Sequence, residues 1–185
     1  SVGSVSDVKF DGLDSRYDLA SSAVTNNAGS ANTNAHTIGA SGSLTVAKSA
    51  TTASTQTYVK GSTGKEVVKI NLTAGSGEDI SVTSITLRCF NGSGATACGS
   101  TGTTTNAKLL KADGTQYGST VANPSATVSF SGNIIVPASE TITLSLVADI
   151  PTTAGTGSFH FEHQGAADQT STGLSSSADI TETGT

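Results

Sequence analysis

The stretch Thr141-Ile-Thr-Leu-Ser-Leu146 decides the fold class of this chain. Ile142, Leu144 and Leu146 stand at every second position, and Thr or Ser fills the positions between them. Because successive side chains of a β-strand point to opposite faces, this spacing places the three aliphatic side chains on one face. The stretch therefore predicts a strand with one buried face, and Pro151 closes the run.

The same alternation recurs along the chain, between clusters of Gly, Ser, Asn and Asp that are typical of turns. The apolar parity changes across Thr83-Ser84, which predicts a β-bulge. Ala112-Asp-Gly-Thr115 predicts a hairpin turn, because Asp-Gly tolerates the positive φ angles that the turn requires. The predicted strands contain Val8 and Phe10; Leu44 and Val46; Thr57 to Val59; Val68, Ile70 and Leu72; Ile80 to Cys89; Leu109 and Leu110; Tyr117 and Val121; Val128 and Phe130; Ile134 and Val136; and Phe159 and Phe161.

Short strands separated by frequent turn signals predict an all-β fold, an immunoglobulin-like or jelly-roll-type antiparallel β-sandwich. The crossover helices that a parallel sheet would need are not evident in the sequence. We expect the sandwich over residues 43–163, preceded by an N-terminal extension, residues 1–42. A polar C-terminal segment, residues 164–185, would follow, with an edge strand as one interpretation.

Composition excludes several classes of partner. The 185 residues include 28 Ser, 30 Thr and 21 Gly, and the net charge is −5. Nine Lys and Arg spread along the chain form no basic stripe, so nucleic acid is not an expected partner. No apolar run approaches the roughly 20 residues that a membrane helix requires. The chain begins at Ser1 and not at Met, which suggests a processed or trimmed N-terminus.

Cys89 and Cys98 are the only cysteines, and Gly and Ser between them make closure of a loop easy. A redox pair or half of a metal site are the alternatives, but there is no CxxC motif and no His beside either cysteine. The pattern favours a structural disulfide and hence an oxidising, extracellular environment. A loop this short gains only about 2 to 3 kcal/mol from chain entropy.

Four stretches resemble one kind of module: Tyr58 to Gly61, Glu66 to Ala74, Glu78 to Leu87 and Ile135 to Ile150. They are similar to Ser/Thr-rich immunoglobulin-like β-sandwich modules of prokaryotic cell-surface, S-layer-like or extracellular filament proteins. The resemblance covers about two thirds of the chain and carries no catalytic residue. It implies surface display and assembly, and the N-terminal extension is similar in kind to that of filament subunits joined by donor strands.

The first residues have the pattern of a strand that one subunit could donate to another. Val8 and Phe10 share one face of a strand while Asp7 and Lys9 occupy the other. A donated strand satisfies an open sheet edge and fills the core of the acceptor with alternate side chains. The chain is therefore expected to be a non-enzymatic subunit of an extracellular filament or surface layer, a homopolymer of itself. The candidate donor residues are Val2, Val5, Val8 and Phe10.

Four common catalytic motifs are missing, namely GxSxG, HExxH, a Walker loop and GxGxxG, and no cofactor is expected. A hydrolase without such a motif is the alternative that the many Ser residues leave open. His160, Glu162 and His163 are the strongest metal candidate, but a strand would point His163 away from the other two. The alternative interpretation places all three on the outer face. A second, weaker metal candidate for Ca²⁺ is the acidic cluster of Asp7, Asp11, Asp14 and Asp18.

The sequence suggests two relations to glycans, as a covalent modification and as a ligand. Asn71-Leu-Thr73 and Asn91-Gly-Ser93 are sequons, so Asn71 and Asn91 are candidate N-glycosylation sites. The alternative function is a carbohydrate-binding or adhesin module, with surface glycans as partners. Such modules usually stack aromatic rings on sugars, and only 4% of this chain is aromatic. An exposed pair among Tyr17, Tyr58 and Tyr117 would favour that function.

Overall fold

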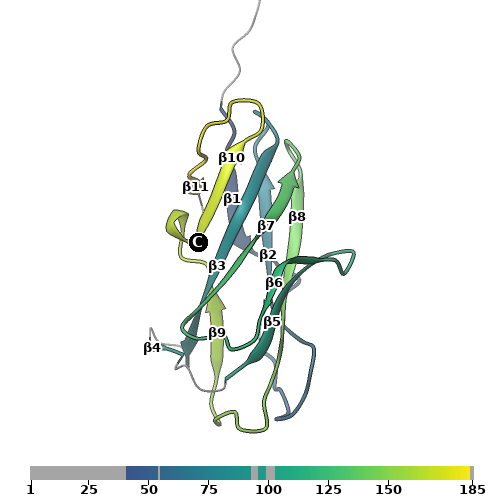
Figure 1. The fold of residues 1–185 in the computed structure, drawn as a ribbon, viewed down its shortest axis with the longest axis vertical. Coiled ribbons are helices and arrows are strands. Elements are labelled where there is room, and N and C mark those ends of the chain that lie inside the picture. Colours follow the sequence, from purple (N-terminus) through teal and green to yellow (C-terminus); the bar gives the residue numbers. More distant parts are fainter. Residues whose placement is uncertain (1–40, 54, 93–95, 99–102, 184–185) are drawn as a thin grey trace, which may run out of the picture. The chain divides into compact units, whose positions relative to one another are not determined.

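A computed structural model describes residues 41–183, apart from 54, 93–95 and 99–102. Within these residues the chain is nearly all β, and a short 3-10 helix, η3 (Ala166–Asp168), interrupts the strands. Strands pack as two sheets, which confirms the predicted all-β sandwich (Figure 1). The predictions for residues 1–40 lie outside the described residues; they comprise the donor strand and the cluster of Asp7, Asp11, Asp14 and Asp18.

The first sheet has six strands in the order β11-β1-β2-β8-β5-β6. All neighbours in it are antiparallel except β1 and β11, which are parallel. The bounds are β1 (Leu44–Lys48), β2 (Lys65–Ala74), β5 (Thr105–Lys111), β6 (Gln116–Val121), β8 (Thr141–Asp149) and β11 (Glu182–Thr183).

The second sheet is arranged around one long strand, β3 (Ile80–Asn91). On one side β3 pairs with β7 (Thr127–Val136), and its last residues pair with the short β4 (Thr96–Ala97). Its other side is shared by two strands in succession. The first half of β3 pairs with β10 (Gln169–Gly173) and the second half with β9 (Phe159–Glu162) (Figure 1).

The core lies between the sheets and consists of the alternating apolar residues. Leu144 and Leu146 of β8 are fully buried, as the opening stretch predicts. Each large aliphatic side chain that is buried in this way contributes about 1.5–3 kcal/mol. Tyr117 crosses the core, and its hydroxyl donates to the carbonyl of Val82 at 3.2 Å. Burial raises the pKa of Tyr117 to about 12, so this hydroxyl stays protonated as a donor.

Two predicted details of the backbone are confirmed. The pairing of β3 with β7 shifts register between Val82 and Ser84, so that Val82 and Ile85 both face the core. The β5–β6 hairpin turns at Gly114, whose φ is 82°. Asp113 Oδ1 stabilises the turn by accepting the N–H of Thr115 at 2.8 Å.

The predicted strand at Thr57 to Val59 is wrong. These residues form a loop, and the Val59 side chain is 75% exposed. Val59 has no apolar residue two positions before or after it, so this segment has no apolar face that burial in a sheet would stabilise. Tyr58 is instead fixed by its hydroxyl, which donates to the carbonyl of Glu66 at 2.6 Å.

The segment 164–185, set apart from the sandwich in the sequence interpretation, contributes β10 and β11 to the two sheets. The sandwich therefore continues beyond residue 163, to Thr183 at the end of β11. Ile180 between these strands belongs to the core, whereas Leu174 is 48% exposed.

The side of the sandwich formed by β6 and β7 is closed by close backbone approach. Gly118 has φ 70°, and a Cβ there would lie 2.8 Å from the carbonyl oxygen of Ser131. Gly132 lies against the ring of Tyr117, where a Cβ would come within 3.1 Å. Glycine at these two positions lets the edges of the two sheets meet.

Candidate functional site

The opposite side of the sandwich, formed by β9, β10, β1 and β11, has an open part. Within the part of the chain that the structure describes, β9 pairs with β3 alone and no strand pairs with its outer edge. Such an edge presents unpaired backbone groups that can bind another strand.

The hydrogen bonds of Cys89 identify the residues of β9 that present these groups. Cys89 donates its N–H to Ala126 and accepts from Cys98, so its backbone points away from β9. Residues directly opposite each other in an antiparallel pair point their backbone groups both inward or both outward. Phe161 lies opposite Cys89 and therefore points its N–H and C=O to the outer edge. Phe159, two residues earlier, does the same.

The end of β1 across from β9 is also open. The β1–β11 ladder stops at the pair Thr45 and Thr183. The N–H of Ser49 donates to Lys69 of β2 at 2.9 Å, so the preceding residue, Lys48, points its backbone groups the other way. Among the described residues, no strand pairs with this part of β1.

Two hollows lie along β9, between it and the first sheet. The smaller one, of about 340 Å³, is mainly apolar and reaches from β9 to β1 and β2. The larger one, of about 1030 Å³, continues past Phe159 toward the loops of residues 55–60 and 154–158. Both share Phe161 and Glu162 of β9 as a wall. The smaller hollow is lined by Val46, Ala47, Lys48, Val68, Ile70, Phe161, Glu162 and His163.

Aromatic rings line the larger hollow. The ring centroids of Tyr58 and Phe159 lie 6.1 Å apart, and those of Phe159 and Phe161 are at the same separation in an edge-to-face arrangement. His160 stacks on Phe90 with centroids 5.5 Å apart. Phe161 is 7% exposed, whereas Tyr58 and Phe159 are half-buried, so apolar surface remains accessible in the hollow.

The other end of the same side is closed by the turn after β10. Thr172 of β10 forms a bridge with Asp179, so the returning chain covers the outer edge of β10. Glu78 holds this turn: its carboxylate accepts the N–H groups of Ser175 and Ser176 at 2.8 and 2.9 Å. It also accepts the N–H of Gly42 at 3.0 Å, which fixes the chain just before β1.

The Glu78 carboxylate is strongly stabilised in its charged form. The backbone and hydroxyl hydrogen bonds from Ser176, with those from Gly42 and Ser175, lower the pKa of Glu78 to about 2. A Cβ on Gly173 would overlap the Glu78 carboxylate, so a glycine is needed there.

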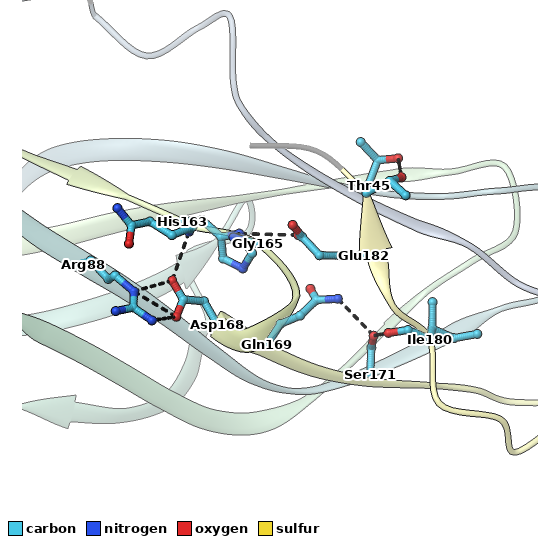
Figure 2. A network of polar contacts seen from close by, with 11 residues as sticks. Thr45, Arg88, His163, Gly165, Asp168, Gln169, Ser171, Ile180 and Glu182 are labelled. Atoms are coloured by element: carbon cyan, nitrogen blue, oxygen red, sulfur yellow. Dashed lines mark hydrogen bonds and ion pairs between the residues drawn. The ribbon is translucent and has the colours of Figure 1, made fainter.

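A polar network lies between the closed and the open end (Figure 2). Arg88 binds Asp168 through two nitrogens, with Nη2–Oδ1 at 2.6 Å and Nε–Oδ2 at 2.9 Å. Asp168 is 2% exposed and also accepts the N–H of Gln164 at 3.0 Å. Burial raises the pKa of Asp168, but the hydrogen bonds from Arg88 and Gln164 outweigh it and leave the pKa below its ordinary value.

His163 and Glu182 form a second, weaker pair in this network. Nδ1 of His163 lies 3.4 Å from Oε2 of Glu182, and both side chains are almost completely buried. Burial, with the Asp168 charge added, raises the pKa of Glu182 to about 7, and burial lowers the pKa of His163. At neutral pH His163 is therefore neutral and Glu182 is only partly ionised.

The metal candidate of the sequence does not assemble. His160 and Glu162 lie on one face, with Nε2–Oε1 at 2.9 Å, and His163 points to the other. Placing His163 on the outer face is wrong, because it is buried against Glu182 beyond the end of β9. No group of three metal-binding side chains occurs in residues 41–183, as far as the structure describes them.

The predicted cysteine bridge is present. Cys89 and Cys98 are joined by a disulfide, with their Cα atoms 5.3 Å apart. Both residues are buried at the end of the sheet, where β4 returns along β3. The bridge therefore holds β4 against β3 on the side opposite β9.

The structure shows how exposed the two sequon asparagines and two of the three tyrosines are. Asn71 lies on the outer face of β2, where its Oδ1 accepts the hydroxyl of Thr143 at 2.8 Å, and Asn91 is exposed at the end of β3. Tyr117 is buried in the core and Tyr58 is half-buried, so these two do not form an exposed pair. Tyr17 lies outside the described residues.

Sequence reasoning missed the charged residues of this side. Arg88, Asp168 and Glu78 belong to no motif, and each meets its partners across a large separation in sequence. Glu182 offered one signal, because it stands two residues after Ile180 and so shares the face of that core residue. That alternation would have indicated a buried carboxyl.

No family model, no curated protein and no solved structure matches this chain. The part of the chain that the structure describes contains no helix with the length and hydropathy of a membrane span.

Proposed function

We propose that this protein is a non-enzymatic structural subunit of an extracellular filament or surface layer, in which copies join by strand exchange. The observation that supports this most directly is the outer edge of β9. There the backbone groups of Phe159 and Phe161 face a hollow with apolar walls, and no described residue pairs with them.

Strand addition suits this edge energetically. An added strand gains main-chain hydrogen bonds, and every second side chain of it can enter the hollow. The partners are other copies of the chain, so that each copy both offers an edge and completes one. The Cys89–Cys98 disulfide supports the extracellular location, because such bridges persist in oxidising compartments.

Blocking the outer edge of β9 tests this function. Phe159→Pro removes the outward N–H while leaving the side that pairs with β3 intact, since proline is tolerated on an edge strand. Phe159→Val is the matched control, because it also removes the ring but keeps the N–H. Full chains of both variants are compared by electron microscopy and by size-exclusion chromatography, with thermal unfolding as the check of folding.

We expect the unmodified chain and Phe159→Val to form fibres or a lattice, and Phe159→Pro to remain monomeric. Equal assembly of the two variants would contradict addition at β9. An unmodified chain that stays monomeric under the conditions of its native environment would contradict the structural function itself.

A carbohydrate-binding or adhesin module is the second candidate, and one observation favours it. The rings of Tyr58 and Phe159 are half-buried in the larger hollow, where aromatic faces could pack on a sugar. A glycan array with the unmodified chain, Tyr58→Ala and Phe159→Ala tests it. Binding that both substitutions abolish would support this candidate, and an empty array would remove it.

A further inference from the structure

We infer that the strand received by β9 is Val2–Phe10 of a second copy of this chain, lying parallel to β9 with Lys9 opposite Glu162. This inference rests on the proposed strand exchange, and it specifies the occupant and the register. Several independent features of the described residues and of the sequence lead to it.

The first feature is the match of alternating faces. On β9, the side chains of Phe159 and Phe161 face inward, and those of His160 and Glu162, which alternate with them, face outward. In the occupant, Val8 and Phe10 alternate with charged residues in the same way. Neighbouring strands keep their side chains on common faces, so Lys9 opposite Glu162 places Val8 beside Phe161 on the inner face.

Charge fixes the register. With Lys9 opposite Glu162, a parallel strand places Asp7 opposite His160. The pair of Lys9 and Glu162 then joins opposite charges, and the pair of Asp7 and His160 joins a carboxylate and an imidazole that can hydrogen-bond. Such cross-strand pairs stabilise a sheet. A shift by two residues toward the end of β9 would place Asp7 opposite Glu162, and like charges directly opposite destabilise a pair.

The space along β9 fixes the direction. A strand of nine residues extends over about 30 Å, and β9 itself over about 13 Å. The larger hollow continues past Phe159, whereas the network around Asp168 and Glu182 fills the space beyond the other end of β9. A parallel strand places Val2 to Ser6 along the larger hollow, and Phe10 reaches the smaller, apolar one.

The smaller hollow provides what Phe10 requires. Its walls include Val46, Val68 and Ile70, and its volume of about 340 Å³ accommodates a large apolar side chain. His163 also lines this hollow, and its side chain is only 5% exposed. Its Nε2 atom has no hydrogen-bond partner among the described residues. Backbone carbonyl groups of an incoming strand could accept from that nitrogen.

The length of chain between the strand and the sandwich permits exchange between copies. Residues 11–41 number 31, and an extended chain of that length spans up to about 100 Å. Because this length also permits insertion into the same copy, the experiment must separate the two cases.

Disulfide trapping between full-length chains provides that separation. One batch carries Lys9→Cys and a mass tag, and the other carries Glu162→Cys without the tag. The two are mixed, assembled and oxidised. Directly opposite residues on paired strands lie within the Cα–Cα distance of about 4.4–6.8 Å that a disulfide requires. Lys9→Cys mixed with Lys108→Cys, which is exposed on β5, is the matched control.

We expect a disulfide-linked heterodimer in the first mixture on a non-reducing gel, at least tenfold more abundant than in the control. The double variant Lys9→Cys/Glu162→Cys should give a ladder of linked chains. A double variant that links only within one chain would overturn the second copy as donor. A Gly3→Cys/His160→Cys link instead of the expected one would overturn the register.

Failure of this inference is distinguishable from failure of the proposed function. Polymers that form normally without any link between positions 9 and 162 would overturn the occupant and leave strand exchange at β9 in place. Chains that fold, as judged by an unchanged thermal transition, but form no polymer would contradict both.

Discussion

The two ends of the side formed by β9, β10, β1 and β11 contrast in how they treat their edges. At the β10 end, the turn of residues 174–178 returns the chain over β10, and Glu78 and Ile180 hold it in place. At the β9 end, no described strand covers the edge and two hollows adjoin it. Within the described residues, the same sandwich thus closes one edge with its own chain and leaves the other uncovered.

The two ends also differ in where their charged side chains lie. Only 12% of the residues are charged, yet the closed end and the region next to it bury Glu78, Asp168 and Glu182. Buried charges are costly unless they are hydrogen-bonded, so Glu78 and Asp168 hold in place the backbone N–H groups that donate to them. Glu182 has no hydrogen-bond partner among the described residues, and its pKa is raised to about 7. The open end instead has polar groups at the surface, the imidazole of His160 and the carboxylate of Glu162.

The largest expected effect comes from removing the apolar residues that the open end would receive. Val8→Asp/Phe10→Asp should abolish assembly. Each of these side chains contributes about 1.5–3 kcal/mol on burial, and a loss of about 4 kcal/mol weakens one contact about a thousandfold. The measurement is the critical concentration for assembly, by light scattering and electron microscopy.

Val5→Asp is the control for that experiment. It introduces one negative charge in the same segment, where the double variant introduces two. Val5 is among the candidate donor residues of the sequence, but the proposed register turns it to water, on the face opposite Val8 and Phe10. Assembly should change by less than about threefold. Equal loss of assembly in Val5→Asp would contradict the assignment of faces, and an unaffected double variant would contradict the donor strand.

The strands that the sequence predicted most clearly are those with a large apolar residue at every second position. β2, β3, β7 and β8 have this pattern, and the bulge and the hairpin turn follow from local chemistry. β10 escaped prediction because its buried positions hold Ser171 and Gly173, and β11 because its buried residue is Glu182. Polar or small residues on a buried face leave no hydrophobic alternation to detect.

The open edge could not be predicted from the sequence for a different reason. Which strand lies at an edge depends on pairings between segments far apart, such as Arg88 of β3 with Glu162 of β9. Phe159 and Phe161 indicated a strand but not its neighbours. His163 appeared to be a surface residue, since its burial requires Glu182, which arrives with β11.

An intermediate effect is expected at Glu182, which joins the closed end to β1. Its folded pKa of about 7 lies above its ordinary value of about 4.5, so its contribution to stability is complete below pH 4.5 and is lost as the pH rises through 7. Glu182→Gln should therefore stabilise the protein at pH 9, by up to about 3 kcal/mol, and change little at pH 4.

Urea unfolding at the two pH values measures this effect, with Glu140→Gln, an exposed site, as the control. His163 acts in the opposite sense. Its folded pKa is lowered, so its contribution is present above its ordinary pKa of about 6.5 and falls at lower pH. A Glu182→Gln variant that is less stable than the parent at pH 9 would show that the carboxylate is stabilised by His163 and not penalised by burial.

The smallest and most local effect is expected at Glu78, whose loss should make the closed end resemble the open one. Glu78→Gln weakens the acceptor of the N–H groups of Gly42, Ser175 and Ser176. Amide hydrogen exchange at Ser175 and Ser176 should accelerate several-fold, while the exchange of Leu144 in the core stays unchanged. Glu140→Gln again provides the comparison.

Acid should reproduce the effect of the substitution. Since the folded pKa of Glu78 is about 2 and its ordinary value about 4.5, the stabilisation is present above pH 4.5 and is lost as the pH falls through 2. The parent should therefore approach the exchange pattern of Glu78→Gln only near pH 2. If the variant also loses protection at Gly173 and Ile180, whose N–H groups donate to Ala178 and Ser171, the turn has detached from β10, and the sandwich has gained a second open edge. Protection that remains equal in the two chains would mean that Ile180 and the Thr172–Asp179 bridge close this end without the carboxylate.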